Sequence, residues 1–193
     1  MDIAVKSIIN IFTIIDGKIN LLVDSNNNLL EIECFDNLEL VCSKYIKDNI
    51  DINDLDLKQC YTFSEKSNIF NLKILYIDIV NIDNINLNNN FKFVELDKLD
   101  TNNIYIEKSI DYLKKELVLF STLKKLYPSE FVLPEIQKIY ENLLGKKYDR
   151  RNFRKRLIKL DIIEDINKYS SNKTGRPAKL YKFKDLKEDK ILF

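Results

Sequence analysis

The chain has 193 residues, enough for one domain of ordinary size and a second, smaller one. Its net charge of +1 conceals an uneven distribution. Residues 1–105 carry 9 Lys and no Arg against 17 Asp and Glu, whereas residues 106–193 carry 22 Lys and Arg against 13 Asp and Glu. Such a division predicts a basic module for a polyanion, attached to an acidic domain with another role.

Composition also excludes several kinds of site. The chain has no histidine, and its three cysteines, Cys34, Cys42 and Cys60, form no CxxC pair. Zinc fingers, histidine-dependent triads and histidine-ligated metals are therefore excluded. The odd cysteine number favours buried free thiols in a reducing cytoplasm. Polar residues interrupt the apolar sequence near the start, so we expect neither a signal peptide nor a membrane span.

The acidic half is predicted to consist mainly of strands. The expected strands cover residues 3–15, 19–23, 29–34, 60–63, 72–82 and 91–96. A hairpin turn is expected at Asp16-Gly17-Lys18-Ile19 between the first two. One helix, over residues 38–50, is predicted because apolar residues recur there at helical spacing.

Three helices are predicted in the basic half. The first covers residues 104–126, ends at Tyr127-Pro128 and connects two domains. The second begins at Pro134, a residue preorganised for the first helical position, and ends at Gly145. The third, strongly basic helix follows Asp149, whose carboxylate can accept the free N–H groups of its first turn.

The basic helix and the segment after it predict a nucleic-acid-binding module. Residues 162–166 and 179–183 are expected to form a hairpin around a polar tip. All five arginines lie between Arg150 and Arg176, and a guanidinium matches both phosphate and guanine. A helix, a short turn, a basic helix and a basic hairpin, in this order, indicate a DNA-binding winged helix-turn-helix. The side chains expected in its core are Phe153, Leu157, Leu160, Tyr181 and Phe183.

Two stretches of sequence carry a family resemblance. FVLPEIQKIYENLLGKKYDRRNFRKRLIKLDIIE and the later TGRPAKLYKF resemble the C-terminal winged helix of the Nudix-related transcriptional regulators, the NrtR family. The resemblance implies a preceding Nudix domain, and residues 57–63 and 93–99 are similar to that domain's LEQLYTF and WFPLDEL stretches. The expected fold class is α+β, with a Nudix-like mixed-sheet α/β/α domain followed by a winged helix-turn-helix domain.

The resemblance also sets the expected domain limits. They are 1–105 for a degenerate Nudix-like domain that senses a ligand or dimerises, 106–127 for the connecting helix, 128–184 for the winged helix domain and 185–193 for a C-terminal tail. Members of the family sense a nucleotide such as ADP-ribose, which is the effector implied here. A homodimer on a palindrome is the natural extension of one winged helix on each half-site.

The segment that aligns with the Nudix box has lost most of its pattern. A working box carries an arginine, a glutamate, a pair of glutamates and a glycine in this order, and its glutamates hold Mg²⁺ against a pyrophosphate. In the best register Lys44 replaces the arginine and Tyr45 the first glutamate, while Asp48 and Asn49 replace the paired glutamates and Asp51 the glycine. One carboxylate cannot build a multi-metal site. We therefore expect no pyrophosphohydrolase activity, no metal and no cofactor, and a solvated Asp48.

The predicted DNA contacts fall into three groups. The first group is expected near base edges or phosphates of the major groove and consists of Arg150, Arg151, Asn152 and Arg154. The second group is expected at phosphates and consists of Lys146, Lys147 and Lys155. The third group, on the tip of the hairpin (the wing), consists of Lys173 and Arg176, and Arg176 is expected at a narrow minor groove. These contacts predict a cytoplasmic DNA-binding transcriptional repressor. Two alternatives stay open: a residual Nudix-type nucleotide-processing enzyme, and a winged helix that binds protein.

Overall fold

The computed structural model describes residues 3–52, 55–66, 69–127, 129–170, 177–186 and 188–192. The chain divides into two compact units. The first unit comprises residues 1–15 and 19–112, and the second comprises residues 16–18 and 113–193. Within the described ranges, no helix is both long and apolar enough to cross a membrane.

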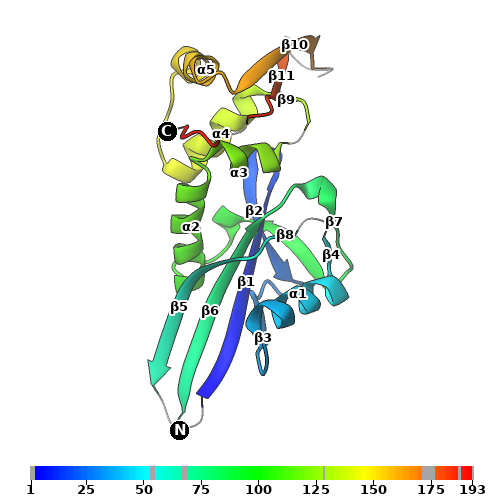
Figure 1. Cartoon of the computed structure of the whole chain (residues 1–193), viewed down its shortest axis with the longest axis vertical. Coiled ribbons are helices and arrows are strands. Elements are labelled where there is room, and N and C mark those ends of the chain that lie inside the picture. The colour runs from blue at the N-terminus through cyan, green and yellow to red at the C-terminus, as the bar shows by residue number, and fades with distance from the viewer. Residues whose placement is uncertain are drawn as a thin grey trace. The chain divides into compact units, whose positions relative to one another are not determined.

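A mixed six-stranded sheet forms the centre of the first unit (Figure 1). Its order is β5-β6-β1-β2-β8, and β3 pairs with β1. β1 runs parallel to β6 over ten residue pairs, from Ile3 opposite Phe70 to Phe12 opposite Ile79. The strands are β1 (Ile3–Ile15), β2 (Lys18–Asp24), β3 (Leu30–Glu33), β5 (Lys58–Lys66), β6 (Phe70–Ile79) and β8 (Phe91–Glu95). The predicted strands are thus all present, with limits shifted by a few residues.

Helices cover both faces of this sheet because side chains of β1 alternate between its two faces. Ile9 and Ile11 join the core beneath helix α1 (Leu38–Asn49). Between them, Asn10 points to the other face, where its Nδ2 donates to Ser109 Oγ of helix α2 (Ile104–Glu116) at 2.7 Å. This gives the predicted α/β/α layers. A short pair of strands, β4 (Asp51–Ile52) and β7 (Ile85–Asn86), was not predicted, nor were the 3-10 turns η1 (Ile82–Asn84) and η2 (Leu96–Lys98).

The prediction of one continuous helix over 104–126 was wrong. Helix α2 ends at Glu116, and α3 (Phe120–Leu126) begins after a three-residue break. Neither glycine nor proline lies in the break, so tertiary partners must explain it. The hydroxyl of Tyr140 donates to the carbonyl oxygen of Leu117, and the amide of Leu192 donates to that of Val118 at 2.7 Å. These bonds satisfy carbonyl groups that a continuous helix would have used internally.

Residues 188–192, which we call the C-terminal segment, lie within the stretch expected to be a tail, yet they pack against the second unit. Leu192 is completely buried in its core, and Ile191 forms a β-bridge with Leu119. The carboxylate of Asp189 accepts hydrogen bonds from the amide and hydroxyl of Ser121, at 2.9 and 2.6 Å. The apolar side chain of Leu192 explains why this segment docks, because its burial removes apolar surface from water.

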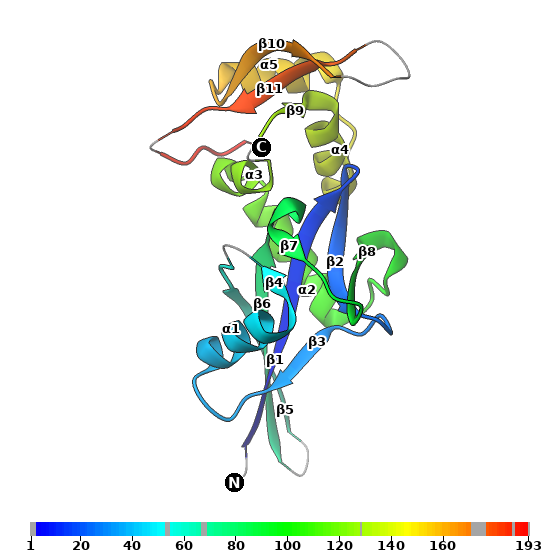
Figure 2. The ribbon, with the colours of Figure 1, turned by 90° about the vertical axis from the view of Figure 1, so that its right-hand side faces the viewer.

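Helices α3, α4 (Leu133–Leu144) and α5 (Arg150–Lys159) pack with a small sheet in the second unit (Figure 2). The sheet contains the predicted hairpin, β10 (Ile163–Tyr169) and β11 (Lys179–Phe183), in the order β10-β11-β9. Its third strand, β9 (Phe131–Val132), was not predicted as a strand. In the core the rings of Phe131 and Phe183 lie 4.4 Å apart between centroids. The predicted core side chains Phe153, Leu157, Tyr181 and Phe183 are buried, and Leu160 packs against them.

Candidate nucleic-acid interface

The turn between helices α4 and α5 determines where the basic helix α5 begins. Helix α4 starts at Leu133 with Pro134 in its first turn, and it stops at Gly145, whose φ of 61° is left-handed. Glycine adopts this conformation without a Cβ penalty, which is why it ends helices so often. The predictions for both ends of this helix are confirmed to within one residue.

Glu141 fixes the loop that follows. Its Oε1 accepts hydrogen bonds from Gln137 Nε2 and from the amide of Tyr148, both at 2.9 Å, and its Oε2 accepts one from Lys147 Nζ at 3.1 Å. These bonds, led by the one from Gln137, lower the pKa of Glu141 to about 2, because each favours the carboxylate over the acid. Gln137 also donates to the carbonyl oxygen of Tyr148 at 2.8 Å. The residues before α5 are thereby held in one conformation.

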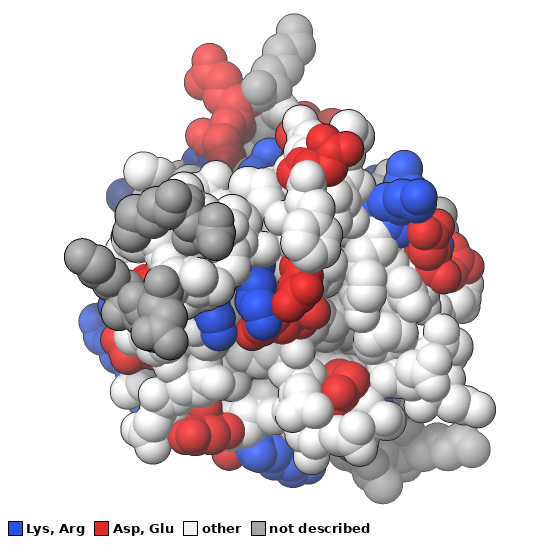
Figure 3. Space-filling view, turned by 90° about the horizontal axis from the view of Figure 1, so that it is seen from below, with Lys and Arg blue, Asp and Glu red and all other residues white. Residues whose placement is uncertain are grey.

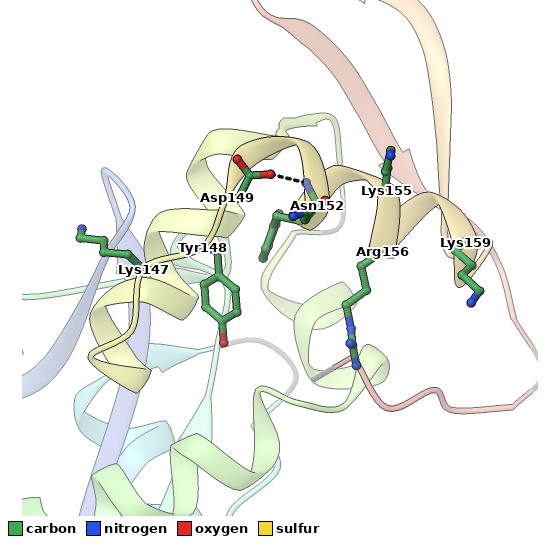
Figure 4. Close-up of a pocket in the computed structure, with 8 residues that line it drawn as sticks. Lys147, Tyr148, Asp149, Asn152, Lys155, Arg156 and Lys159 are labelled. Atoms are coloured by element: carbon green, nitrogen blue, oxygen red, sulfur yellow. Dashed lines mark hydrogen bonds between the residues drawn. The ribbon is translucent and has the colours of Figure 1, made fainter.

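Asp149 caps α5 as predicted. Its Oδ1 accepts a hydrogen bond from the amide of Asn152 at 2.9 Å, and this satisfies one of the free N–H groups of the first turn (Figure 4). Phe153 and Leu157 then anchor the helix, with 3% and 0% of their surfaces exposed. The ring of Phe153 lies 6.0 Å from that of Tyr140 and 5.8 Å from that of Tyr148, measured between centroids.

The remaining side chains of α5 are exposed, and most of them line two hollows. One, of about 200 Å³, is lined by Arg150 and Arg154 together with Pro134 and Gln137 of α4 and with Lys179 and Tyr181 of β11. The other, of about 510 Å³, is lined by Asn152, Lys155, Arg156 and Lys159 together with Lys147 and Tyr148 of the loop (Figure 4). The predicted major-groove residues therefore separate. Arg150 and Arg154 lie beside β11, Asn152 lies on the opposite flank, and the exposed Arg151 lines neither hollow.

Several basic residues near α5 already have partners. Arg156 donates from Nε to the carbonyl oxygen of Leu192, which turns its side chain toward the C-terminal segment (Figure 4). Lys147 pairs with Glu141 although 88% of its side chain is exposed, and the ammonium of Lys146 lies 5.8 Å from the centroid of the Tyr148 ring. In the wing, Lys179 forms an ion pair with Asp165. The predicted wing-tip residues Lys173 and Arg176 lie outside the described residues.

Two exposed residues of α5, Lys159 and Ile158, were not among the predicted contacts. Lys159 lines the larger hollow, seven residues after Asn152 and four after Lys155. Ile158, at 49% exposure, lies four residues after Arg154 and seven after Arg151. Helical spacing from the predicted contacts could have found both, because residues three, four and seven apart share a face.

The first unit offers a different surface. On the face drawn in Figure 3, acidic and basic side chains are interspersed among uncharged ones. Helix α1, where the Nudix box aligns, carries Asp48 exposed to solvent, as expected. Within the described residues, no three or more Cys, Asp or Glu side chains gather closely enough to hold a metal ion.

Comparison with solved structures defines the class of protein. The chain superposes on Shewanella oneidensis NrtR complexed with a 27-mer DNA with a TM-score of 0.71, at 21% identity and with 93% of each chain covered. A MutT/nudix family protein from Enterococcus faecalis gives 0.64 at 13% identity, over 95% of this chain and 87% of that one. The fold is therefore α+β, a Nudix-like domain followed by a winged helix domain, and the expected fold class is confirmed.

The sequence adds a match within the second unit. Residues 124–183 match the family model of the NrtR DNA-binding winged helix domain, and the predicted resemblance is confirmed. A stretch of 58 residues, 30% of this chain, is 40% identical to the ADPR responsive transcriptional repressor NtrR of Acinetobacter baylyi. That match spans 23% of the relative's length.

Proposed function

We propose that this chain is a transcriptional repressor that binds double-stranded DNA through helix α5. One observation carries the proposal: a capped helix in a domain that matches the NrtR winged helix exposes a row of basic side chains, while Phe153 and Leu157 anchor its other face. Winged helices place such a helix in the major groove. The repressor NtrR and the DNA-bound Shewanella protein support the same assignment.

The two hollows beside α5 suggest separate roles for its flanks. Arg150 and Arg154, beside β11, are suited to guanine edges, where a bidentate contact contributes about 1–3 kcal/mol of discrimination. Lys155 and Lys159, at the larger hollow, are suited to phosphates, which position the protein without specifying sequence. Arg156 is turned toward the C-terminal segment, so we assign it a supporting role and no DNA contact.

One winged helix covers one half-site, so we propose a homodimer on a palindromic operator, acting in the cytoplasm of a bacterium. The first unit would supply effector sensing. The name of the Acinetobacter relative points to ADP-ribose or a similar nucleotide as the effector. A hollow of about 370 Å³ in the first unit has a mixed polar and apolar lining, and its polar residues, among them Asn28, Glu31, Asn103 and Tyr105, have groups that could hydrogen-bond a nucleotide.

The DNA-binding proposal is tested with the full chain and its own upstream intergenic DNA over a series of salt concentrations. We expect tight binding that weakens with salt, by a slope of about −0.9 in log K against log salt for each phosphate contact. The Arg150→Ala, Arg154→Ala double variant should lose preference for this DNA over random DNA of equal length. The matched control, Lys44→Ala, Lys47→Ala on α1, removes two exposed charges from the first unit and should bind like wild type. Equal affinity of the wild type for both DNAs would contradict the proposal.

We also propose that the first unit has no Nudix hydrolase activity, because its aligned box keeps one carboxylate, Asp48, of the glutamate set. Incubation with ADP-ribose and Mg²⁺ should yield no AMP, whereas ADP-ribose should weaken binding to the upstream DNA. Mg²⁺-dependent hydrolysis would favour the alternative of a residual nucleotide-processing enzyme. A basic module that binds a protein in place of DNA would instead show no salt-dependent affinity for the upstream fragment.

A further inference from the structure

Helix α5 exposes one apolar side chain, next to its C-terminal residue, among basic ones. Ile158 is 49% exposed and is absent from the core cluster of the second unit. The other exposed positions of this fully described helix are all charged or amide side chains: Arg150, Arg151, Asn152, Arg154, Lys155, Arg156 and Lys159. Ile158 therefore interrupts a surface that is otherwise polar.

Ile158 lies outside the core of the second unit, and helix stability does not favour isoleucine at this position. The core side of α5 is supplied by Phe153 and Leu157, and the residue after Leu157 points about 100° away from it around the helix. Isoleucine is also a weaker helix former than lysine or arginine, because its branched side chain loses rotamer freedom in a helix. An exposed isoleucine here lowers both solubility and helix propensity without adding to the core.

The neighbours of Ile158 indicate what it faces. It lies one turn after Arg154 and Lys155 and two turns after Arg151, so all four share the outer side of the helix. A recognition helix lies in the major groove, so a side chain on its outer side faces the DNA. The apolar group displayed there is the 5-methyl group of thymine, which distinguishes a T·A pair from the other base pairs.

We infer that Ile158 is a specificity-determining residue that contacts a thymine 5-methyl group in the operator. This inference rests on the proposed function and deepens it, because it adds one apolar base contact to the charged ones. Burying about one methyl group in this contact would strengthen binding roughly fourfold, which corresponds to about 0.8 kcal/mol. The contact should vanish when the base lacks its methyl group, as deoxyuridine does.

The test uses the full chain and its upstream intergenic fragment, synthesised once with thymidine and once with deoxyuridine at every T. Dissociation constants are measured for the wild type, for Ile158→Ala and for the control Lys155→Ala, which removes an exposed charge from the same side. Alanine is the best helix former, so Ile158→Ala should fold, and its circular dichroism is compared with that of the wild type. The quantity of interest is the loss of affinity on replacing thymidine by deoxyuridine.

We expect this loss to be roughly fourfold smaller for Ile158→Ala than for the wild type, and unchanged for Lys155→Ala. Equal losses for the wild type and Ile158→Ala would overturn the inference while leaving DNA binding intact. A weaker Ile158→Ala complex with equal losses would assign Ile158 to a contact other than thymine, such as a protein surface. If the wild type does not prefer the thymidine fragment to random DNA, the proposed function itself fails, and the inference fails with it.

Discussion

Replacing Tyr140 by phenylalanine tests whether tertiary hydrogen bonds hold the break between α2 and α3. The Tyr140 hydroxyl donates to the carbonyl oxygen of Leu117, and 1% of the side chain is exposed. Burial raises the pKa of Tyr140 well above its ordinary value, so the hydroxyl remains a donor throughout the neutral range. Phenylalanine keeps the ring in the core beside Phe153 and removes only the donor.

The expected cost follows from that geometry. Phenylalanine leaves no large cavity, so the main effect is that the buried carbonyl group of Leu117 loses its hydrogen-bond donor. This should lower the free energy of unfolding by about 1–3 kcal/mol. Urea unfolding of the full chain, with hydrogen exchange of α3 and α4 amides as a local readout, measures it. Tyr169→Phe makes the same change on a side chain that is 62% exposed, and should stay within about 0.5 kcal/mol of wild type. A cost below about 0.5 kcal/mol for Tyr140→Phe would refute this account of the break.

Substitutions at three further positions test other contacts of the second unit. Asp149→Ala should lower the unfolding free energy, measured in urea, by about 0.5–2 kcal/mol, whereas Asp149→Asn, which keeps a side-chain acceptor, should lose much less; no loss for Asp149→Ala would show that the cap is unimportant. The pKa of Glu141 is lowered from 4.5 to about 2. The contribution of its carboxylate to the free energy of unfolding is therefore complete above pH 4.5 and is lost as the pH falls toward 2. Glu141→Gln should therefore flatten the acid-unfolding profile in that window, and an unchanged profile would contradict the assigned bonds. Leu192→Ala should cost about 2–5 kcal/mol by calorimetry or urea unfolding, and a neutral result would mean that the C-terminal segment does not dock.

Local signals predicted most of the second unit. Asp149 and Gly145 mark helix ends because the chemistry of a cap depends on one residue and its own backbone. The spacing of Phe153 and Leu157 likewise identified the buried side of α5. The alternation of strands and the position of α1 in the first unit were also evident, because long apolar runs between turn residues have few other structural outcomes.

The features that sequence analysis missed depend on contacts between distant residues. The break after Glu116 exists because Tyr140 and Leu192, 23 and 74 positions from their partners Leu117 and Val118, supply donors to its carbonyl groups. Helical periodicity continues through the break and gives no sign of it. The orientation of Arg156 toward the carbonyl oxygen of Leu192 is unpredictable for the same reason. Composition identified the basic helix, but only the fold shows which cations pair with a carboxylate or with the backbone.

The parallel pairing of β1 with β6 also has a consequence for synthesis. β1 ends at Ile15, whereas β6 begins at Phe70, so the ribosome must add more than fifty residues before this edge of β1 can be covered. At 5–20 residues per second that interval lasts about 3–10 s. During this time a strand rich in isoleucine presents unpaired amide and carbonyl groups, the template on which chains aggregate. Aggregation during expression should therefore depend on temperature and chaperone supply more than on the stability of the finished protein.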